Sequence, residues 1–123
     1  MTDKISVLYV DDEPINLKIF ELSFKNRFKI FTALSGFEGM DILREQPGIL
    51  VVVSDMRMPK MDGLEFIETA KKEFPNIVFF ILTGYDITDR ISQALEHKLI
   101  NKYFRKPFNF NEIESSIVEA LGN

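Results

Sequence analysis

Residues 5–12 read ISVLYVDD and residues 49–55 read ILVVVSD, so two short apolar runs each end in acidic residues. Short runs rich in Val, Ile and Leu that lack helical spacing are typical of buried strands. Carboxylates at the ends of such strands are costly to desolvate and repel one another. We therefore expect Asp11, Asp12 and Asp55 to gather around a bound cation.

Apolar runs of the same kind recur along the chain and alternate with segments of helical spacing. Strands this apolar, separated by helices, predict an α/β fold with a doubly wound, five-stranded parallel sheet. Helices should cover both faces of the sheet through right-handed crossovers. The predicted strands cover residues 5–10, 28–33, 49–54, 77–82 and 101–104.

Helix start signals lie where this alternation requires them. Ser35 with Glu38 and Asn109 with Glu112 are start signals in which an acidic residue follows the cap at the third position. Apolar residues at helical spacing then define the faces that should pack on the sheet. For the second, third and fifth helices these are Phe37, Met40 and Leu43; Leu64, Ile67 and Phe74; and Ile113, Ile117 and Leu121.

Two further helix starts follow acidic residues. The first helix should begin near Glu13 and Pro14, where Asp12 is expected to act partly as a cap. Asp62 and Gly63 are interpreted as a turn that leads into the third helix, in which the glycine allows a positive φ.

The composition fits one compact domain over residues 1–123, because 46% of the residues are hydrophobic and the chain is too short for two domains. The net charge of -4 and the scattered 15 Lys and Arg residues argue against direct binding to nucleic acid. The lack of cysteine fits a reducing compartment. Without a signal-peptide layout or an apolar stretch near the roughly 18 residues that span a bilayer, we expect a cytoplasmic protein with no membrane insertion.

Two other polar residues complete the set at the strand ends. Thr83 follows the fourth predicted strand and Lys106 follows the fifth. In an open parallel sheet, ligands bind outside the carboxyl ends of the strands, where the strand order reverses. One acid alone would mean little, because acidic side chains are usually solvated. The convergence of all five residues on one edge predicts a functional site there.

Four motifs carry a resemblance to a known family: DDEP at residues 11–14, SDMRMPKMDG at 54–63, LTGY at 82–85 and KYFRKPF at 102–108. Together they resemble the receiver domain of two-component response regulators. Each motif alone is weak, but four in this order make the resemblance specific, and it covers essentially the whole chain. It implies the flavodoxin-like strand order 2-1-3-4-5 and a place in a phosphorelay. The implied partners are a sensor histidine kinase or a histidine phosphotransfer protein, and an output domain or downstream protein.

The resemblance also implies a role for each matching residue. Asp55 is expected to be the phosphoacceptor, and Asp11 and Asp12 the acidic pair that binds Mg²⁺. The main-chain carbonyl of Arg57 is expected to be a further metal ligand, so the side chain need not disturb the site. The remaining implied roles are those of the switch hydroxyl (Thr83), the switch aromatic (Tyr103) and the lysine typical of such domains (Lys106).

The chemistry of these side chains points the same way. Two like charges about 4 Å apart cost roughly 4 kcal/mol at an effective dielectric near 20, so three carboxylates and a phosphate require a divalent cation. Oxygen ligands without histidine or cysteine favour Mg²⁺ or Mn²⁺. A carboxylate can act as a phosphoryl nucleophile, and the acyl phosphate it forms later hydrolyses. The domain would thus catalyse only its own modification and its own hydrolysis.

A switch mechanism follows from the same residues. Lys106 can pair with Asp55 before transfer and with the phosphoryl group afterwards, and Pro107 is expected to hold its turn, with a cis bond as one option. Thr83 can donate to another phosphoryl oxygen, and its movement would let Tyr103 rotate from solvent towards the interior. The surface of the fourth helix, fifth strand and fifth helix would then change shape, so it is a candidate for homodimer formation.

Two other functions stay open from the sequence. A pseudo-receiver that serves as a docking scaffold would keep the fold without phosphorylation, but the full set of acidic, hydroxyl and lysine positions argues against it. A Mg²⁺-dependent phosphatase with an aspartyl nucleophile would need a second acid two residues after Asp55, where this chain has Arg57. Tyr85 and Arg57 are expected at the rim, where they could set the lifetime of the acyl phosphate.

Overall fold

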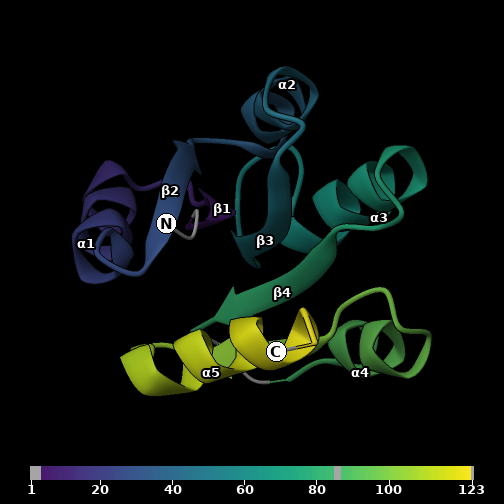
Figure 1. Cartoon of the computed structure of the whole chain (residues 1–123). Coiled ribbons are helices and arrows are strands. Elements are labelled where there is room, and N and C mark those ends of the chain that lie inside the picture. Colours follow the sequence, from purple (N-terminus) through teal and green to yellow (C-terminus); the bar gives the residue numbers. More distant parts are fainter. Residues whose placement is uncertain (1–3, 85–86, 123) are drawn as a thin grey trace.

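The computed structural model describes residues 4–84 and 87–122, and within them five strands alternate with five helices (Figure 1). The strands are β1 (Ile5–Val10), β2 (Phe28–Ala33), β3 (Ile49–Asp55), β4 (Val78–Thr83) and β5 (Lys102–Arg105). The helices are α1 (Pro14–Phe24), α2 (Gly36–Glu45), α3 (Gly63–Glu73), α4 (Asp89–Glu96) and α5 (Phe110–Ala120).

All strand pairs are parallel, and the sheet order is β2-β1-β3-β4-β5. This confirms the predicted flavodoxin-like order. The register pairs Val10 of β1 with Ser54 of β3, so the residues that follow these two partners lie side by side at the carboxyl edge. The order reverses between β1 and β3, which is the position where sheets of this kind bind ligands.

The strands end slightly later than the apolar runs suggest. Asp55 and Thr83 are the last residues of β3 and β4 rather than the first residues after them. The ladder explains the difference, because Asp55 pairs with Leu82 and Thr83 pairs with Arg105. Backbone hydrogen bonding therefore continues past the last apolar side chain, and it fixes the two polar residues on the sheet.

The core lies in two layers, one on each face of the sheet, because strand side chains point alternately to the two faces. Val7 and Tyr9 of β1 face a layer that α1 and α5 cover, and Leu8 and Val10 face the layer that α2, α3 and α4 cover (Figure 1). The first layer is rich in aromatic rings that contact one another, among them the tilted pair Phe20 and Phe24 and the stacked pair Phe80 and Phe104.

Most helix starts follow the predicted signals. The side chains of Ser35 and Asn109 accept hydrogen bonds from the backbone N–H groups of Glu38 and Glu112. The predicted start of α1 near Glu13 and Pro14 is confirmed, but the prediction that Asp12 caps this helix is wrong. The N-terminal cap residue is Glu13, which makes no side-chain cap, and its N–H donates to Oδ1 of Asp11.

The predicted apolar face of α2 is wrong at one position. Met40 and Leu43 are buried, but the side chain of Phe37 is 54% exposed. The first turn of α2 buries Gly36 and Gly39 instead, and a Cβ atom on Gly39 would lie 3.0 Å from the ring of Phe66. The buried face of α2 is therefore Gly36, Gly39, Met40 and Leu43, with the Phe66 ring packed against the two glycines, and Phe37 lies off this face.

Gly63 also has a different role from the predicted one, because the only glycine with positive φ among the described residues is Gly122. Asp62 caps α3 in a capping box with Glu65. A Cβ atom on Gly63 would lie 2.3 Å from the carbonyl oxygen of Asp55, far inside normal contact. The glycine is therefore needed for close backbone approach beneath the acidic edge.

Among the residues that the structure describes, no helix combines the length and the apolar character needed to cross a membrane.

Candidate functional site

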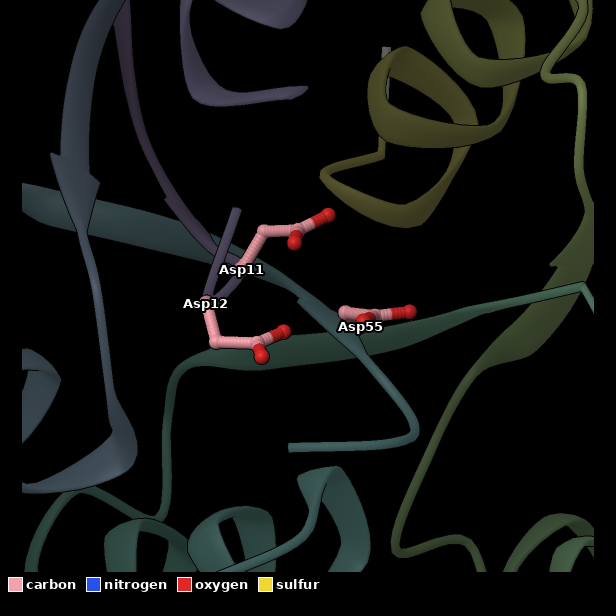
Figure 2. A group of neighbouring side chains, drawn as sticks. All are labelled: Asp11, Asp12 and Asp55. Atoms are coloured by element: carbon pink, nitrogen blue, oxygen red, sulfur yellow. The ribbon is translucent and has the colours of Figure 1, made fainter. Parts of the chain in front are cut away.

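The three acidic residues converge at the carboxyl edge of the sheet. Asp11 and Asp12 follow β1 and Asp55 ends β3, and their carboxylates point toward the same space (Figure 2). One oxygen of each lies within 4.8 Å of the others. Asp11 is fully buried and Asp55 is 7% exposed, whereas Asp12 is more exposed, so the cluster joins two buried carboxylates to one that solvent reaches. The structure thus brings together the trio that the sequence singled out.

Lys106 reaches into this cluster from the loop after β5. Its Nζ lies 3.0 Å from Oδ1 of Asp55 and 3.6 Å from Oδ2 of Asp11. Its backbone N–H donates to the carbonyl of Thr83, and the bond to Pro107 is cis. The lysine turn is thereby tied to the end of β4, and one ammonium group is shared between two buried carboxylates.

The charges in the site do not balance. Burial raises the pKa of Asp55 from 3.8 to about 6, and the charges of Asp11 and Asp12 add to the rise while Lys106 opposes it. Burial alone would lower the pKa of Lys106, but its hydrogen bond to Asp55 and the nearby negative charges raise it. One lysine therefore does not neutralise three acids, and the site retains net negative charge.

Asp11 is held at both of its oxygens. Oδ1 accepts a hydrogen bond of 3.0 Å from the N–H of Glu13, and Oδ2 accepts one of 2.7 Å from the hydroxyl of Tyr9. Sequence reasoning missed Tyr9, which lies inside an apolar run and reads as a core residue. The available signal was its position two residues before Asp11, because residues at that spacing on a strand share a face.

The other predicted residues lie outside the acidic trio. Thr83 is 1% exposed at the end of β4, and Arg57 is exposed in the segment after β3. Both line a cavity of about 200 Å³ near the start of α4. Tyr103 is half-buried in β5 and packs against the layer of α2, α3 and α4. Tyr85 lies outside the described residues.

A family model described as the response regulator receiver domain matches residues 7–118. The chain belongs to this family. As a receiver domain, it has the expected sheet order, and its acidic edge occupies the position where the order reverses. Receiver domains are signalling domains of two-component systems, so the family places this chain in signal transduction.

Two relatives of this receiver domain have almost the same length. Sporulation initiation phosphotransferase F of Bacillus subtilis is 32% identical over 98% of this chain and 95% of that protein. The probable chemotaxis protein CheY of Rhizobium etli is 33% identical over 99% of this chain and 96% of that protein. The crystal structure of a response regulator receiver domain protein from Clostridium thermocellum has a TM-score of 0.88 at 30% identity, covering 94% of this chain and 93% of that chain.

Other relatives are much longer. The hydrogenase transcriptional regulatory protein HoxA of Cupriavidus necator is 29% identical over 98% of this receiver domain, which spans 25% of that protein. The receiver fold therefore occurs both nearly alone and as one quarter of a larger regulator.

The side chains of the site fit a hard divalent cation. The cluster offers carboxylate oxygens from Asp11, Asp12 and Asp55, and neither histidine nor cysteine takes part in it. Oxygen ligands of this kind suit Mg²⁺ and Mn²⁺. Burial is the main cause of the raised pKa of Asp55, and the charges of Asp11 and Asp12 add to it, so a bound dication would favour the ionised carboxylate.

Proposed function

We propose that this receiver domain accepts a phosphoryl group on Asp55 from a sensor histidine kinase or a histidine phosphotransfer protein. The observation that carries the proposal is the contact of Asp55 with Lys106 at 3.0 Å, in a cluster that also holds the buried Asp11 and the more exposed Asp12. We further propose that the chain acts as one domain in the cytoplasm and catalyses only its own phosphorylation and dephosphorylation.

Asp55 is the nucleophile in this proposal. A carboxylate oxygen of Asp55 forms a bond to phosphorus, the bond from phosphorus to the donor nitrogen breaks, and the electron pair leaves with the donor imidazole. Dephosphorylation is the attack of water on the same phosphorus, which returns a free carboxylate and inorganic phosphate. Lys106 balances the carboxylate before transfer and binds a phosphoryl oxygen after it.

A Mg²⁺ ion would be held by Asp11, Asp12, Asp55 and the main-chain carbonyl of Arg57. When bound, it supplies charge neutralisation for the carboxylates and for the phosphoryl oxygens in the transition state. The side chains contribute the rest: Asp11 is fixed by Tyr9 and by the backbone, so it need not reorganise when the phosphoryl group arrives.

Thr83 and Tyr103 form the proposed switch. Thr83 ends β4 next to the partner of Asp55, and its hydroxyl would move to donate to a phosphoryl oxygen. Tyr103 pairs with Ile81 in the neighbouring strand and is half-buried, and in this switch its ring would turn further inward. The surface of α4, β5 and α5 would change with it, and this surface is the proposed contact for a downstream protein, an output domain or a second copy of the chain.

The phosphodonor is proposed to dock beside the site on α1. Ile15, Ile19 and Leu22 are large apolar side chains that α1 leaves exposed. Ile19 also lines an apolar cavity of about 540 Å³ that reaches Lys106. Exposed apolar side chains of this kind mark protein contacts, and a donor must approach from this edge to deliver phosphorus to Asp55.

The experiment is to incubate the Mg²⁺-loaded protein with a small phosphodonor and to measure its intact mass. The proposal predicts a gain of one phosphoryl group that needs the metal and disappears in Asp55→Asn. Asp62→Asn is the matched control, because it neutralises another acid on the same segment and should leave the adduct intact. The absence of any adduct would favour a docking scaffold, and continuous phosphate release from varied monoesters would favour a phosphatase.

A further inference from the structure

Tyr9 makes the shortest hydrogen bond to the acidic cluster. Its hydroxyl lies 2.7 Å from Oδ2 of Asp11, and the two residues are 2% and 0% exposed. The other oxygen of Asp11 accepts from the N–H of Glu13 at 3.0 Å. Since both partners belong to β1 or to the turn that follows it, the carboxylate is fixed within its own segment of chain.

The hydroxyl of Tyr9 is not needed for packing. A phenylalanine ring would fill the same space, and a buried hydroxyl costs free energy unless it finds an acceptor. The chain has 12 Phe and 3 Tyr, and Tyr9 is the only tyrosine among the largest fully buried side chains that the structure describes. The other aromatic residues in that group are Phe20, Phe24, Phe66, Phe79, Phe80 and Phe104.

The ring of Tyr9 is held in place. It stacks on Phe20 with centroids 4.1 Å apart and an interplanar angle of 10°. Phe20 in turn contacts Phe24 and Phe108, at centroid distances of 4.6 and 5.7 Å. A ring fixed in this way directs its hydroxyl to one acceptor, and that acceptor is Asp11.

Lys106 also contacts Oδ2 of Asp11, but it is held less tightly there than Tyr9. Its side chain is 30% exposed, and it lies closer to Asp55 (3.0 Å) than to Asp11 (3.6 Å). Under the proposed function, Lys106 moves onto the phosphoryl group after transfer. Tyr9 then remains as the donor that keeps Oδ2 of Asp11 in place.

We propose that Tyr9 is a positioning residue for the cation site, acting through its hydrogen bond to Asp11. This inference rests on the proposed function, because it assigns Tyr9 a role toward the cation that Asp11 would bind. A partner that orients a metal-binding carboxylate typically contributes 10–100-fold to metal affinity, so loss of the hydroxyl should weaken Mg²⁺ binding by about that factor.

The test is a calorimetric Mg²⁺ titration of the wild-type protein and of Tyr9→Phe. Ser116→Ala is the matched control, because it removes another buried hydroxyl, the acceptor of a 3.2 Å bond from Lys102, on α5. We expect about 10–100-fold weaker binding in Tyr9→Phe and unchanged binding in Ser116→Ala. Equal affinity in the wild type and Tyr9→Phe would overturn the inference.

A second measurement follows the Tyr9 hydroxyl in the wild-type protein by NMR. It therefore does not depend on whether Tyr9→Phe folds, and it reports on the hydrogen bond rather than on general stability. With tyrosine labelled at the ring carbon that bears the hydroxyl, the wild type gives one carbon signal for each of its 3 tyrosines. The Tyr9 signal is assigned by elimination with Tyr85→Phe and Tyr103→Phe. We expect its chemical shift to change with Mg²⁺ concentration in the same way as the calorimetric signal does. A Tyr9 chemical shift that is the same without Mg²⁺ and at saturating Mg²⁺ would contradict the inference. Failure of the wild type to bind Mg²⁺ at all would instead contradict the proposed function.

Discussion

Asp55 ends β3 and Asp62 caps α3 at the other end of the connecting loop, yet the surroundings of the two carboxylates are opposite. Burial raises the pKa of Asp55 to about 6, and Lys106 only partly opposes this. Burial alone would also raise the pKa of Asp62, but hydrogen bonds from Arg90 and from the backbone of Glu65 outweigh it and lower that pKa. The guanidinium of Arg90 reaches both oxygens of Asp62, at 2.8 and 3.3 Å.

The difference indicates that Asp62 has a structural role and that Asp55 is available for a reaction. Asp62 caps α3 and has its charge matched within the protein. Asp55 shares one ammonium group with Asp11 and keeps unmatched charge. A buried charge that is only partly matched is unfavourable, so its presence at the edge where sheets of this kind bind ligands indicates a function that offsets the cost.

The largest expected effect of the unmatched charge on Asp55 is a pH dependence of the free energy of unfolding. The folded protein binds a proton at Asp55 more tightly than the unfolded chain, whose value is 3.8, so stability falls as the pH rises from 3.8 through about 6. The difference of about two units between the folded and unfolded pKa of Asp55 corresponds to a loss of at most about 3 kcal/mol in the free energy of unfolding. Asp55→Asn should remove this loss. Urea unfolding in metal-free buffer at several pH values measures it.

The variant and the wild type should unfold alike near pH 3.8, and Asp55→Asn should be the more stable at pH 7. Added Mg²⁺ should then stabilise the wild type and narrow the gap. A difference that does not vary with pH, or an Asp55→Asn protein that is less stable at pH 7, would show that the charge of Asp55 is already matched.

Replacing Asp62 should lower the free energy of unfolding, whereas replacing Asp55 should raise it at pH 7, and the effect at Asp62 should be the smaller one. Asp62→Ala deletes the cap of α3 and the contact with Arg90, at a cost of about 1–2 kcal/mol in the free energy of unfolding. Asp62→Asn keeps a capping side chain and loses only the charge, which for a partly exposed pair is about 0.2–1 kcal/mol. Mg²⁺ affinity should be unchanged in both variants, and a clear loss of affinity would mean that the two regions are not separate.

Much of this architecture is readable from the sequence. The apolar runs predict the five strands to within a residue, because strands covered on both faces leave a continuous apolar pattern. The placement of Asp11, Asp55 and Lys106 after those runs predicts one edge, because parallel strands share their carboxyl ends. The resemblance supplied the strand order, which local patterns do not encode.

The residues that the sequence did not predict depend on contacts between distant segments. Phe37 is exposed because the buried face of α2 includes Gly36 and Gly39, which pack against Phe66 of α3 and carry no apolar side chain that a sequence pattern would count. Gly63 reads as a turn residue, and only the approach to the Asp55 carbonyl shows why it must lack a side chain. Tyr9 reads as core, because the direction of a hydroxyl is set by ring packing against Phe20.

The central claim is that Asp11, Asp12 and Asp55 form one cation site in which Asp55 accepts a phosphoryl group. Its most direct test is a crystal structure of the protein grown with Mg²⁺ and beryllofluoride. The account predicts beryllofluoride on Asp55 and one ion at about 2.0–2.1 Å from its oxygen ligands, held among the acidic trio and the carbonyl of Arg57. An edge with no ion, or beryllofluoride bound away from Asp55, would contradict it.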